Sequence, residues 1–520
     1  MRLQKLEFSD TRSFSTFFLD YIQKKDSLKP FYSKFPEIKN FKVQISEKEK
    51  SFPDSTRKIL HDVLQKQYAG VEITESVKNN LASLGDKKTF TVTTGHQLNI
   101  FTGPLYFIYK IVTVVNSCKE LKKHYPEYNF VPVYWMASED HDYDEIKYFR
   151  LYGKKYTWQT DQTGAVGRFD PTSIKKLFEE IPGDVNLFRE AYLKHATLSA
   201  AVRYYVNELF GAQGLVVVDA DDRQLKSTFA KVIEADLFDH TPKKLVEEQN
   251  DQLKSLGYDP QVFARDINFF YLDKNLRSRI EAVGDKFHVV DTHIQFTKEE
   301  IQKLIKSEPE KFSPNVILRP LYQEFILPNL AYAGGPAEVV YWLQLKKVFD
   351  HFKVPFPMLM PRNFALIVDK PVSRKFEKTG LEYEHLFEEK NYLFNQWIVK
   401  HSIHDLSLGK SMQSIREDFT AIREKASQVD VTLTKFIEAQ TKRTLNGLEK
   451  IEQKMLRAEK RLHADRLGQL ESVKDELFPN GNPQERVDNF LNFYQQDPKL
   501  IDQLLETFDP FDYRFNLLFY

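Results

Sequence analysis

The sequence predicts an α/β protein built on a parallel sheet, with a long helical arm late in the chain. Residues 89–144 read as strand, loop, helix and strand, and a right-handed crossover makes two such strands parallel neighbours. Between residues 383 and 477 the composition changes to polar helix. Apolar residues there follow the 3, 4, 3, 4 spacing of a coiled coil: Leu448, Ile451, Met455, Ala458 and Leu462.

The amino-acid composition excludes several classes of partner and site. Lys plus Arg and Asp plus Glu both number 74, so no overall field attracts nucleic acid or an anionic membrane, and we expect neither as a partner. The one cysteine, Cys118, cannot form an internal disulfide or a cysteine zinc site, and it falls on the buried stripe of a helix. The start of the chain has no apolar targeting segment, and the most apolar stretch is interrupted by Lys110. We therefore expect a cytoplasmic protein.

The first half of the chain divides by pattern. Residues 1–88 read as a helical lead-in that packs on the core. We expect the following segments after it: 89–148, the first βαβ unit, with its helix at 104–123; 149–213, a connecting insertion; 214–222, a core strand with the sequence GLVVVDADD; and 223–285, a second insertion with helices and a hairpin.

The second half completes the sheet and adds the arm. Residues 286–382 are expected to hold the rest of the core, with strands at 286–291, 315–320, 355–360 and 364–369, which gives five or six strands in all. Residues 383–478 form the coiled-coil arm, and 479–520 dock back on the core. The arm is a natural dimerisation element. Its basic flanks favour an ordinary solvated face over a nucleic-acid arm.

The first candidate site follows the first strand. A loop at the carboxyl edge of a parallel sheet is where ligands bind, and Thr102 can cap a helix whose first turn holds Pro104. Free amides at that helix start favour an anion. His96 is a catalytic candidate, and the substrate-binding candidates here are Thr94, Gly95, Gln97, Asn99, Thr102, Gly103 and Tyr106.

The sequence Thr93-Thr94-Gly95-His96 has the pattern T-x-G-H. It resembles the signature of nucleotidylyl transferases and class I aminoacyl-tRNA synthetases, in which the glycine admits the nucleotide and the histidine contacts phosphate. The longer loop before the helix departs from that pattern. The alternative is a turn glycine beside a hydrogen-bonded histidine.

The second strand of the unit ends in the densest ionisable cluster, Glu139-Asp140-His141-Asp142. Like charges this close predict a raised pKa for at least one carboxyl, and an imidazole beside it can be oriented for proton transfer. Asp140, His141 and Asp142 are therefore catalytic candidates, with Glu139 in substrate binding. A Mg²⁺ or transition-metal site and a helix start carrying acidic residues are the alternatives.

A second glycine loop repeats the design of the first. Gly334 and Gly335 precede Pro336 and a helical pattern, and Glu338 falls in the first turn. Arg319 is a fork for a carboxylate or phosphate, or half of a structural ion pair. These four residues complete the substrate-binding candidates.

The segments TGHQLNIFTGPLYFIYK, PVYWMASEDHDYDEI, GLVVVDADD, AGGPAEVVYW and DPFDYRFNLLF together resemble the bacillithiol-biosynthesis BshC family. The resemblance implies a Rossmann-like core with inserted connecting segments and a coiled-coil arm that forms a homodimer. It also implies a ligase that joins L-cysteine to the amine of glucosaminyl-malate.

That chemistry requires an activated carboxyl group, most simply through ATP with Mg²⁺, as an acyl-adenylate or acyl-phosphate. Gly95, His96 and the helix start at Pro104 would then hold the activated group. One of residues 140–142 would deprotonate the amine, and Arg319 would bind a malyl carboxylate. Two other classes stay open. One is an adenylyl-transferring enzyme for another acid, and the other is a non-catalytic scaffold of the pathway.

Overall fold

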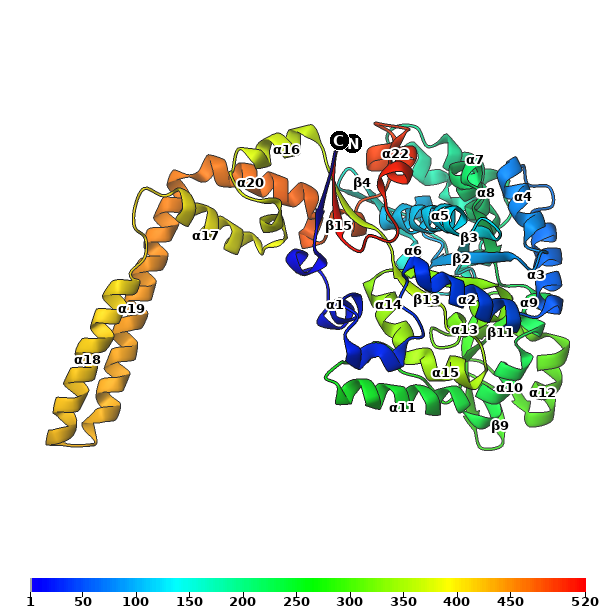
Figure 1. The fold of residues 1–520 in the computed structure, drawn as a ribbon, viewed down its shortest axis with the longest axis horizontal. Helices are drawn as coiled ribbons and strands as arrows, with labels where there is room; N and C mark the ends of the chain where they lie inside the picture. Colours follow the sequence, from blue (N-terminus) through cyan, green and yellow to red (C-terminus); the bar gives the residue numbers. More distant parts are fainter. Residues whose placement is uncertain (1) are drawn as a thin grey trace. The chain divides into compact units, whose positions relative to one another are not determined.

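A computed structural model describes residues 2–520, which divide into two compact units (Figure 1). The first unit holds the chain up to Ser9, Ser13–Leu366 and Pro483–Leu518. The second holds Asp10–Arg12, Ile367–Asn482 and Phe519–Tyr520. No helix among residues 2–520 is long and apolar enough to cross a membrane.

A five-stranded parallel sheet forms the centre of the first unit, in the order β13-β12-β2-β3-β6. Its strands are β2 (Thr89–His96), β3 (Asn129–Met136), β6 (Val216–Asp219), β12 (Asn329–Gly334) and β13 (Met358–Pro361). The chain builds outward from β2 to β6 and then returns to the other side of β2. This is the Rossmann order, and its switch point lies between β2 and β12.

The predicted βαβ unit is confirmed. β2 and β3 pair in parallel from Thr89 opposite Asn129 to His96 opposite Met136. The crossover helix α5 (Tyr106–His124) packs on both strands, and every residue from Phe107 to Cys118 is buried, including Lys110. Strands buried on both faces explain the near-continuous apolar runs of the sequence.

The lead-in contains the helices α1 (Thr16–Ile22), α2 (Ile38–Ser51), α3 (Asp54–Gln67) and α4 (Glu75–Ser83), preceded by a short strand that the sequence did not predict. Between β3 and β6 lie α6 (Tyr143–Ile146), β4 (Tyr148–Leu151), β5 (Lys154–Thr157), α7 (Asn186–Lys194) and α8 (Leu198–Phe210). After β6 come α9 (Arg223–Ser227), α10 (Ala230–Asp239) and α11 (Thr241–Ser255).

A second, antiparallel sheet corrects two strand predictions. Its strands are β7 (Phe269–Asp273), β8 (Leu276–Val283), β9 (Lys286–Val289), β10 (Gln295–Thr297) and β11 (Phe312–Pro314). Residues 286–291 therefore do not return to the parallel sheet, because Gly284, at φ +65°, turns β8 directly back into β9. Residues 315–320 are a turn that leads into α13 (Arg319–Ile326) rather than a strand.

Two further predictions, for strands after residue 326, are wrong. The stretch before Gly335, interpreted as a loop, is the buried strand β12. β14 (Phe364–Val368) was expected in the parallel sheet but belongs to a three-stranded sheet with β1 (Arg2–Leu6) and β15 (Phe515–Phe519). The remaining helices of the first unit are α12 (Lys298–Ser307), α14 (Pro336–Trp342), α15 (Lys346–His351), α21 (Leu491–Tyr494) and α22 (Leu500–Thr507).

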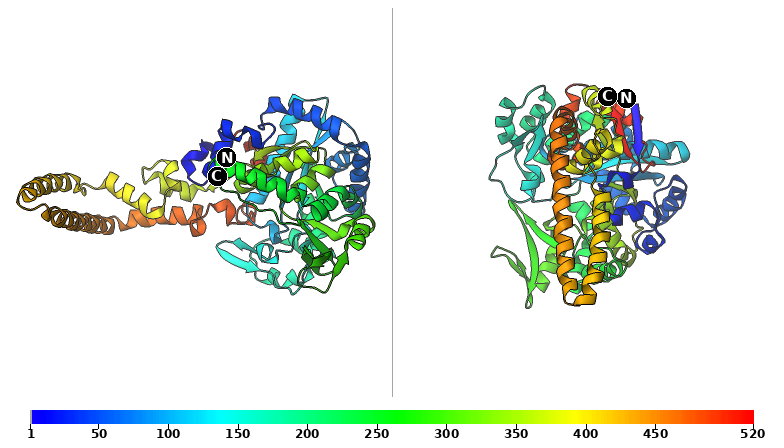
Figure 2. Two further views of the ribbon diagram at one scale, coloured as in Figure 1. Left: turned by 90° about the horizontal axis from the view of Figure 1, so that it is seen from below. Right: turned by 90° about the vertical axis from the view of Figure 1, so that its left-hand side faces the viewer.

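The second unit is helical: α16 (Lys370–Glu377), α17 (Lys390–His401), α18 (Gly409–Val429), α19 (Leu433–Leu462) and α20 (Ala464–Leu477). α18 and α19 run side by side as a hairpin (Figure 2). Of the predicted coiled-coil positions, Leu448 and Met455 are half-buried, whereas Ile451 is 50% and Leu462 75% exposed. The predicted apolar stripe is therefore only partly covered by the chain's own helices.

A buried ion pair anchors two helices beside the switch point. Lys48 of α2 lies 3.1 Å from Glu324 of α13, and both side chains are at most 1% exposed. The other oxygen of Glu324 accepts a hydrogen bond of 2.6 Å from Asn329 at the start of β12. The side-chain oxygen of Asn329 in turn accepts from the hydroxyl groups of Thr91 and Thr93 of β2. The network thus ties both central strands to the helices around them.

Replacing Lys48 by Met should lower the free energy of unfolding by about 3–5 kcal/mol, because it leaves the Glu324 carboxylate buried without a cation. The double variant Lys48→Met with Glu324→Gln removes both charges and should recover most of that loss. Urea unfolding followed by tryptophan fluorescence measures both variants. Equal destabilisation of the single and double variants would contradict this account.

Candidate functional site

A cavity of about 730 Å³ opens in the first unit where β2, β3 and β12 end. It lies at the switch point of the sheet, where open α/β sheets bind their ligands. The structure brings most of the candidate residues to its wall: Gly95, His96, Gln97, Tyr106, Glu139, Asp140, His141, Asp142, Arg319, Gly335 and Glu338. The candidates predicted from three distant segments therefore share one crevice.

Five substrate-binding candidates do not line the cavity: Thr94, Asn99, Thr102, Gly103 and Gly334. Thr94 donates a hydrogen bond of 2.7 Å to the Ala333 carbonyl and so ties β2 to β12. Asn99 donates to the backbone carbonyl of Glu145, and a Cβ on Gly103 would lie 2.5 Å from the Cβ of Asn99. Thr94, Asn99 and Gly103 are therefore engaged in contacts within the fold.

The start of α5 differs from the anion site that we expected there. The helix begins at Tyr106, two residues beyond Pro104, and Thr102 has φ +69° and does not cap it. The Leu105 amide donates to the Asp488 carbonyl, and the Phe107 amide donates to the Pro104 carbonyl. Because the chain itself satisfies these donors, they are not available to a ligand.

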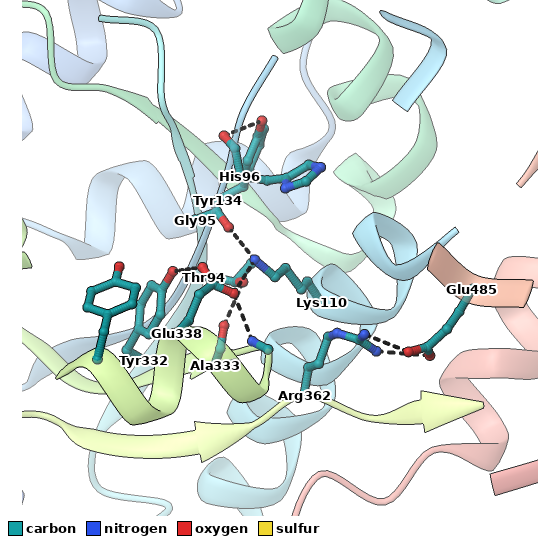
Figure 3. Close-up of polar contacts among 12 residues, drawn as sticks. Thr94, Gly95, His96, Lys110, Tyr134, Tyr332, Ala333, Glu338, Arg362 and Glu485 are labelled. Carbon is teal, nitrogen blue, oxygen red and sulfur yellow. Dashed lines mark hydrogen bonds and ion pairs between the residues drawn. The ribbon is translucent and has the colours of Figure 1, made fainter. Parts of the chain in front are cut away.

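An ion pair between the buried Lys110 and the half-buried Glu338 lines the crevice instead (Figure 3). Lys110 of α5 donates to the Gly95 carbonyl at 2.8 Å and lies 2.6 Å from Glu338 of α14. Tyr332 of β12 donates to the other Glu338 oxygen at 2.6 Å. Burial would raise the pKa of Glu338, but the charge and hydrogen bond of Lys110 hold it at about 2. Glu338 therefore stays ionised at neutral pH, whereas burial lowers the pKa of its partner Lys110.

The second glycine loop is filled by the same carboxylate. The Gly335 amide donates to Glu338 at 2.7 Å, as in a capping box. The prediction of an anion site there was right about the charge and wrong about its source, because the anion is the chain's own Glu338. That carboxylate fixes the edge of the cavity.

Arg319 is a cation without an acidic partner. Its guanidinium donates to the side-chain oxygen of Gln323 at 3.2 Å and to the Tyr341 hydroxyl at 3.5 Å. It also lies over the Tyr332 ring, 5.7 Å from the centroid. Among residues 2–520 no ion pair includes Arg319, so the structural ion-pair alternative is wrong and its charge can meet an anionic ligand.

Other cations on the wall fall into two groups. Arg362 pairs with Glu485 in a two-pronged contact of 2.6 and 3.0 Å, and both side chains are 3% exposed. Arg277 of β8 lies 3.7 Å from Asp140. Arg265 and Arg486 also line the cavity and, in the described part of the chain, are in no ion pair. The cavity wall therefore carries guanidinium groups without acidic partners, which can bind anions.

The acidic cluster holds one carboxyl with a raised pKa, as predicted. Burial raises the pKa of Glu139 to about 7, even though Lys226 of α9 forms an ion pair with it. The main cause is loss of hydration rather than the repulsion between like charges that we expected. Lys226 is fully buried and also donates to the Phe312 carbonyl at 2.6 Å.

The three catalytic candidates of this cluster are held by other contacts. Burial would raise the pKa of Asp140, but the charge of Arg277 and hydrogen bonds from Gln97 and from the backbone amide of His141 hold it well below its usual range. Arg277 donates to Nδ1 of His141 at 2.6 Å, which requires the lone pair of that nitrogen. Asp142 caps α6 by accepting from the Glu145 amide. The helix-start alternative is therefore correct for Asp142.

His96 is a neutral residue of the cavity wall. Burial, together with the charge of Lys110, lowers the pKa of His96 to about 3. Its ring lies 5.3 Å from the Tyr106 ring, and its buried Nε2 has no hydrogen-bond partner among the described residues. His96 is thus suited to give or accept one hydrogen bond without gaining charge. Among residues 2–520 no group of three or more His, Cys, Asp or Glu could hold a metal ion.

Sequence reasoning missed most of the basic residues of the site. Lys110 showed a signal, since a lone lysine in a buried apolar helix needs an internal partner. Arg277 was hidden because its hairpin read as part of an insertion. Lys226, Arg362 and Glu485 had no local pattern at all, because their partners are distant in sequence.

Comparison with known proteins agrees with this architecture. A family model described as "Bacillithiol biosynthesis BshC, N-terminal Rossmann-like domain" matches residues 1–363, and one described as "Bacillithiol biosynthesis BshC, C-terminal coiled-coil domain" matches residues 365–520. Together they cover nearly the whole chain and confirm both the Rossmann-like and the coiled-coil predictions.

Full-length relatives carry the name "Putative cysteine ligase BshC". One from Flavobacterium psychrophilum is 41% identical, over 99% of this chain and 98% of its own. One from Flavobacterium johnsoniae is 41% identical over 99% of both chains, and one from Christiangramia forsetii is 42% identical over 99% and 98%. The similarity thus includes the cavity and the helical arm alike.

Replacing Glu338 by Gln should make the protein's stability less sensitive to acid. The pKa of Glu338 is about 2 in the fold, below its ordinary value of about 4.3, so its stabilising effect is complete above that value and is lost as the pH falls toward 2. The stability difference between native protein and variant should therefore be largest at pH 7 and smaller at pH 3. Urea unfolding at both values measures it.

The control is Glu127→Gln, which removes a carboxylate on the exposed surface. It should unfold like the native protein at both pH values. A stability difference for Glu338→Gln that is constant from pH 7 to pH 3 would contradict the assignment of Glu338 as an ionised buried group.

Proposed function

Because the chain belongs to the bacillithiol biosynthesis BshC family, we propose that it is a ligase that joins the carboxyl group of L-cysteine to the amine of glucosaminyl-malate. The observation that carries the proposal is the charge pattern of the cavity. Guanidinium groups without acidic partners line the same crevice as a carboxyl cluster. A substrate with two malyl carboxylates and one amine has the complementary pattern.

The reaction needs an activated carboxyl group, because a carboxylate is a poor acceptor for an amine. We propose ATP with Mg²⁺ as the activating substrate, through an acyl-adenylate or an acyl-phosphate. The cations of the cavity support this proposal, since phosphoryl groups are stabilised by positioned Arg and Lys side chains. The backbone at Gly95 and the neutral ring of His96 lie at the strand end where such a group would be held.

Purified protein incubated with cysteine, glucosaminyl-malate and Mg-ATP tests the proposal. The mass of the thiol product and the nucleotide formed are both measured. Product with AMP supports adenylation, and product with ADP supports an acyl-phosphate. Absence of product with every nucleotide and donor tried would refute a ligase that acts alone.

Arg319 should bind a malyl carboxylate. Replacing it with Met removes the charge but keeps much of the apolar stem, so KM for glucosaminyl-malate should rise about 10- to 100-fold, the cost of one charge-assisted contact of 1.5–3 kcal/mol. KM for ATP should change little. Steady-state kinetics with each substrate varied in turn measures the two constants.

A matched control is Arg279→Met, an exposed arginine on the same sheet as Arg277 that does not line the cavity. It should leave both constants unchanged. An equal rise in the KM values of both substrates for Arg319→Met would argue for a general distortion of the site instead of a carboxylate contact.

We also propose that the arm pairs two copies of the chain. Ile451 and Leu462 are exposed on α19, and Phe436 of the same helix is 59% exposed. Apolar side chains at coiled-coil spacing are normally covered by another helix, and an identical helix supplies the same pattern.

Ile451→Lys should convert a dimer into a monomer in sedimentation velocity, because it places a charge in the apolar stripe. Gln453→Lys adds the same charge at an exposed position two residues away and should leave the dimer intact. A native protein that sediments as a monomer at all concentrations would contradict the proposed dimer.

A further inference from the structure

Glu139 has one oxygen fixed and one free. It lies in the loop after β3 on the cavity wall, with a side chain that is 13% exposed. One oxygen, Oε1, accepts a hydrogen bond from Lys226. The other, Oε2, has no hydrogen-bond partner among residues 2–520. It is also not fully buried. A carboxylate oxygen therefore faces the cavity with an unused lone pair.

Lys226 holds this carboxylate in place and does not itself reach a ligand. Its side chain is fully buried, its ammonium group donates to both Glu139 and the Phe312 carbonyl, and it lies 5.3 Å from the centre of the Tyr322 ring. Two anchors on separate elements fix the ammonium. Lys226 therefore holds the Glu139 carboxylate, and with it Oε2, in a fixed position.

The surroundings of Glu139 bring its pKa close to neutral pH. Burial raises its pKa to about 7, whereas Lys226 and Arg277 act to lower it and Asp221 to raise it. A general base works best when its pKa is near the working pH. The charged and titratable groups around it are Lys226 on α9, Asp221 after β6, Arg277 on β8, Arg168 before α7 and Tyr322 on α13.

The neighbouring candidates are less suited to accept a proton. The low pKa of Asp140 makes it a weak base, Asp142 caps a helix, and Nδ1 of His141 already accepts a hydrogen bond from Arg277. His96 has an even lower basicity than an ordinary imidazole because it is buried. Of these groups, only Glu139 combines a free oxygen on the wall with an anchoring lysine and a raised pKa.

We propose that Glu139 is the general base of amide formation and that Lys226 is its positioning residue. The inference rests on the proposed ligase function. As the amine nitrogen forms its bond to the activated cysteine carbonyl carbon, its proton passes to Oε2 of Glu139. The bond from that carbon to the phosphoryl oxygen breaks, the leaving phosphate or AMP takes the electron pair, and Glu139 then releases the proton to water.

Replacing Glu139 by Gln tests the role of the base. Amide formation should fall about 10²- to 10⁴-fold, the usual contribution of a general base. In the native protein the rate should rise with pH through a midpoint near 7, and the variant should lose that midpoint. Asp144→Asn, at an exposed position outside the cavity, is the matched control and should keep native rate and profile.

Hydroxylamine separates a lost base from a damaged site. It is a good nucleophile that is largely unprotonated at neutral pH, so it needs no base to trap activated cysteine as a hydroxamate. The ratio of amide to hydroxamate formation should therefore fall at least 10²-fold in Glu139→Gln. An unchanged ratio, with both rates reduced alike, would overturn the proposal.

Lys226→Met provides a second variant. Without its cation the carboxyl group is harder to ionise, so the midpoint of the pH profile should move to a higher pH. A midpoint that stays in place in a folded variant would contradict the role of Lys226. If the native protein forms neither hydroxamate nor amide, the ligase proposal itself fails. If it forms both and Glu139→Gln matches it, only the assignment of the base fails.

Discussion

The Lys110–Glu338 ion pair is the contact on which the cavity depends. It joins the crossover helix α5 to α14, and through Gly95 and Tyr332 it also contacts the ends of β2 and β12. These are the two strands between which the chain order reverses. A Rossmann-like sheet leaves a crevice at this point. The ion pair lines the edge of that crevice, and its carboxylate, Glu338, accepts from three donors.

The cations of the site fall into two groups: those paired with a carboxylate and those without an acidic partner. Lys110 and Arg362 are neutralised by Glu338 and Glu485 and support the structure, whereas Arg319 donates only to neutral groups. On the opposite side, Lys226 fixes Glu139 and Arg277 fixes Asp140 and His141. Cations that stabilise the fold are paired with carboxylates, whereas Arg319 has no acidic partner and is available to a ligand. This division agrees with a substrate that carries carboxylates and an amine.

The sequence was sufficient for the parts of the fold that local pattern determines. The βαβ unit, the strand at residues 216–219 and the helical arm all have strong periodicity or a clear strand-loop-helix order. The strand β12 was missed because its end, Gly334-Gly335, was interpreted as a loop alone, and β9 was misplaced because a short apolar run does not reveal its partner strand.

The candidate site shows the same limit. Residues at strand ends were found because topology brings strand ends together, and eleven of them line the cavity. The helix-start anion sites were wrong because groups of the chain itself accept those amides: Asp488 at Leu105, which is distant in sequence, and Glu338 at Gly335, which is local. Long-range pairing of this kind, including Arg362 with Glu485, follows only from the folded chain.

We propose that the cysteine carboxyl is activated by transfer of a phosphoryl or adenylyl group before the amine attacks. Cysteine labelled with oxygen-18 in its carboxyl group tests it directly in the complete reaction. The account predicts one labelled oxygen in the phosphate or AMP that is released, for each amide formed. Amide product accompanied by unlabelled phosphate and AMP would contradict it.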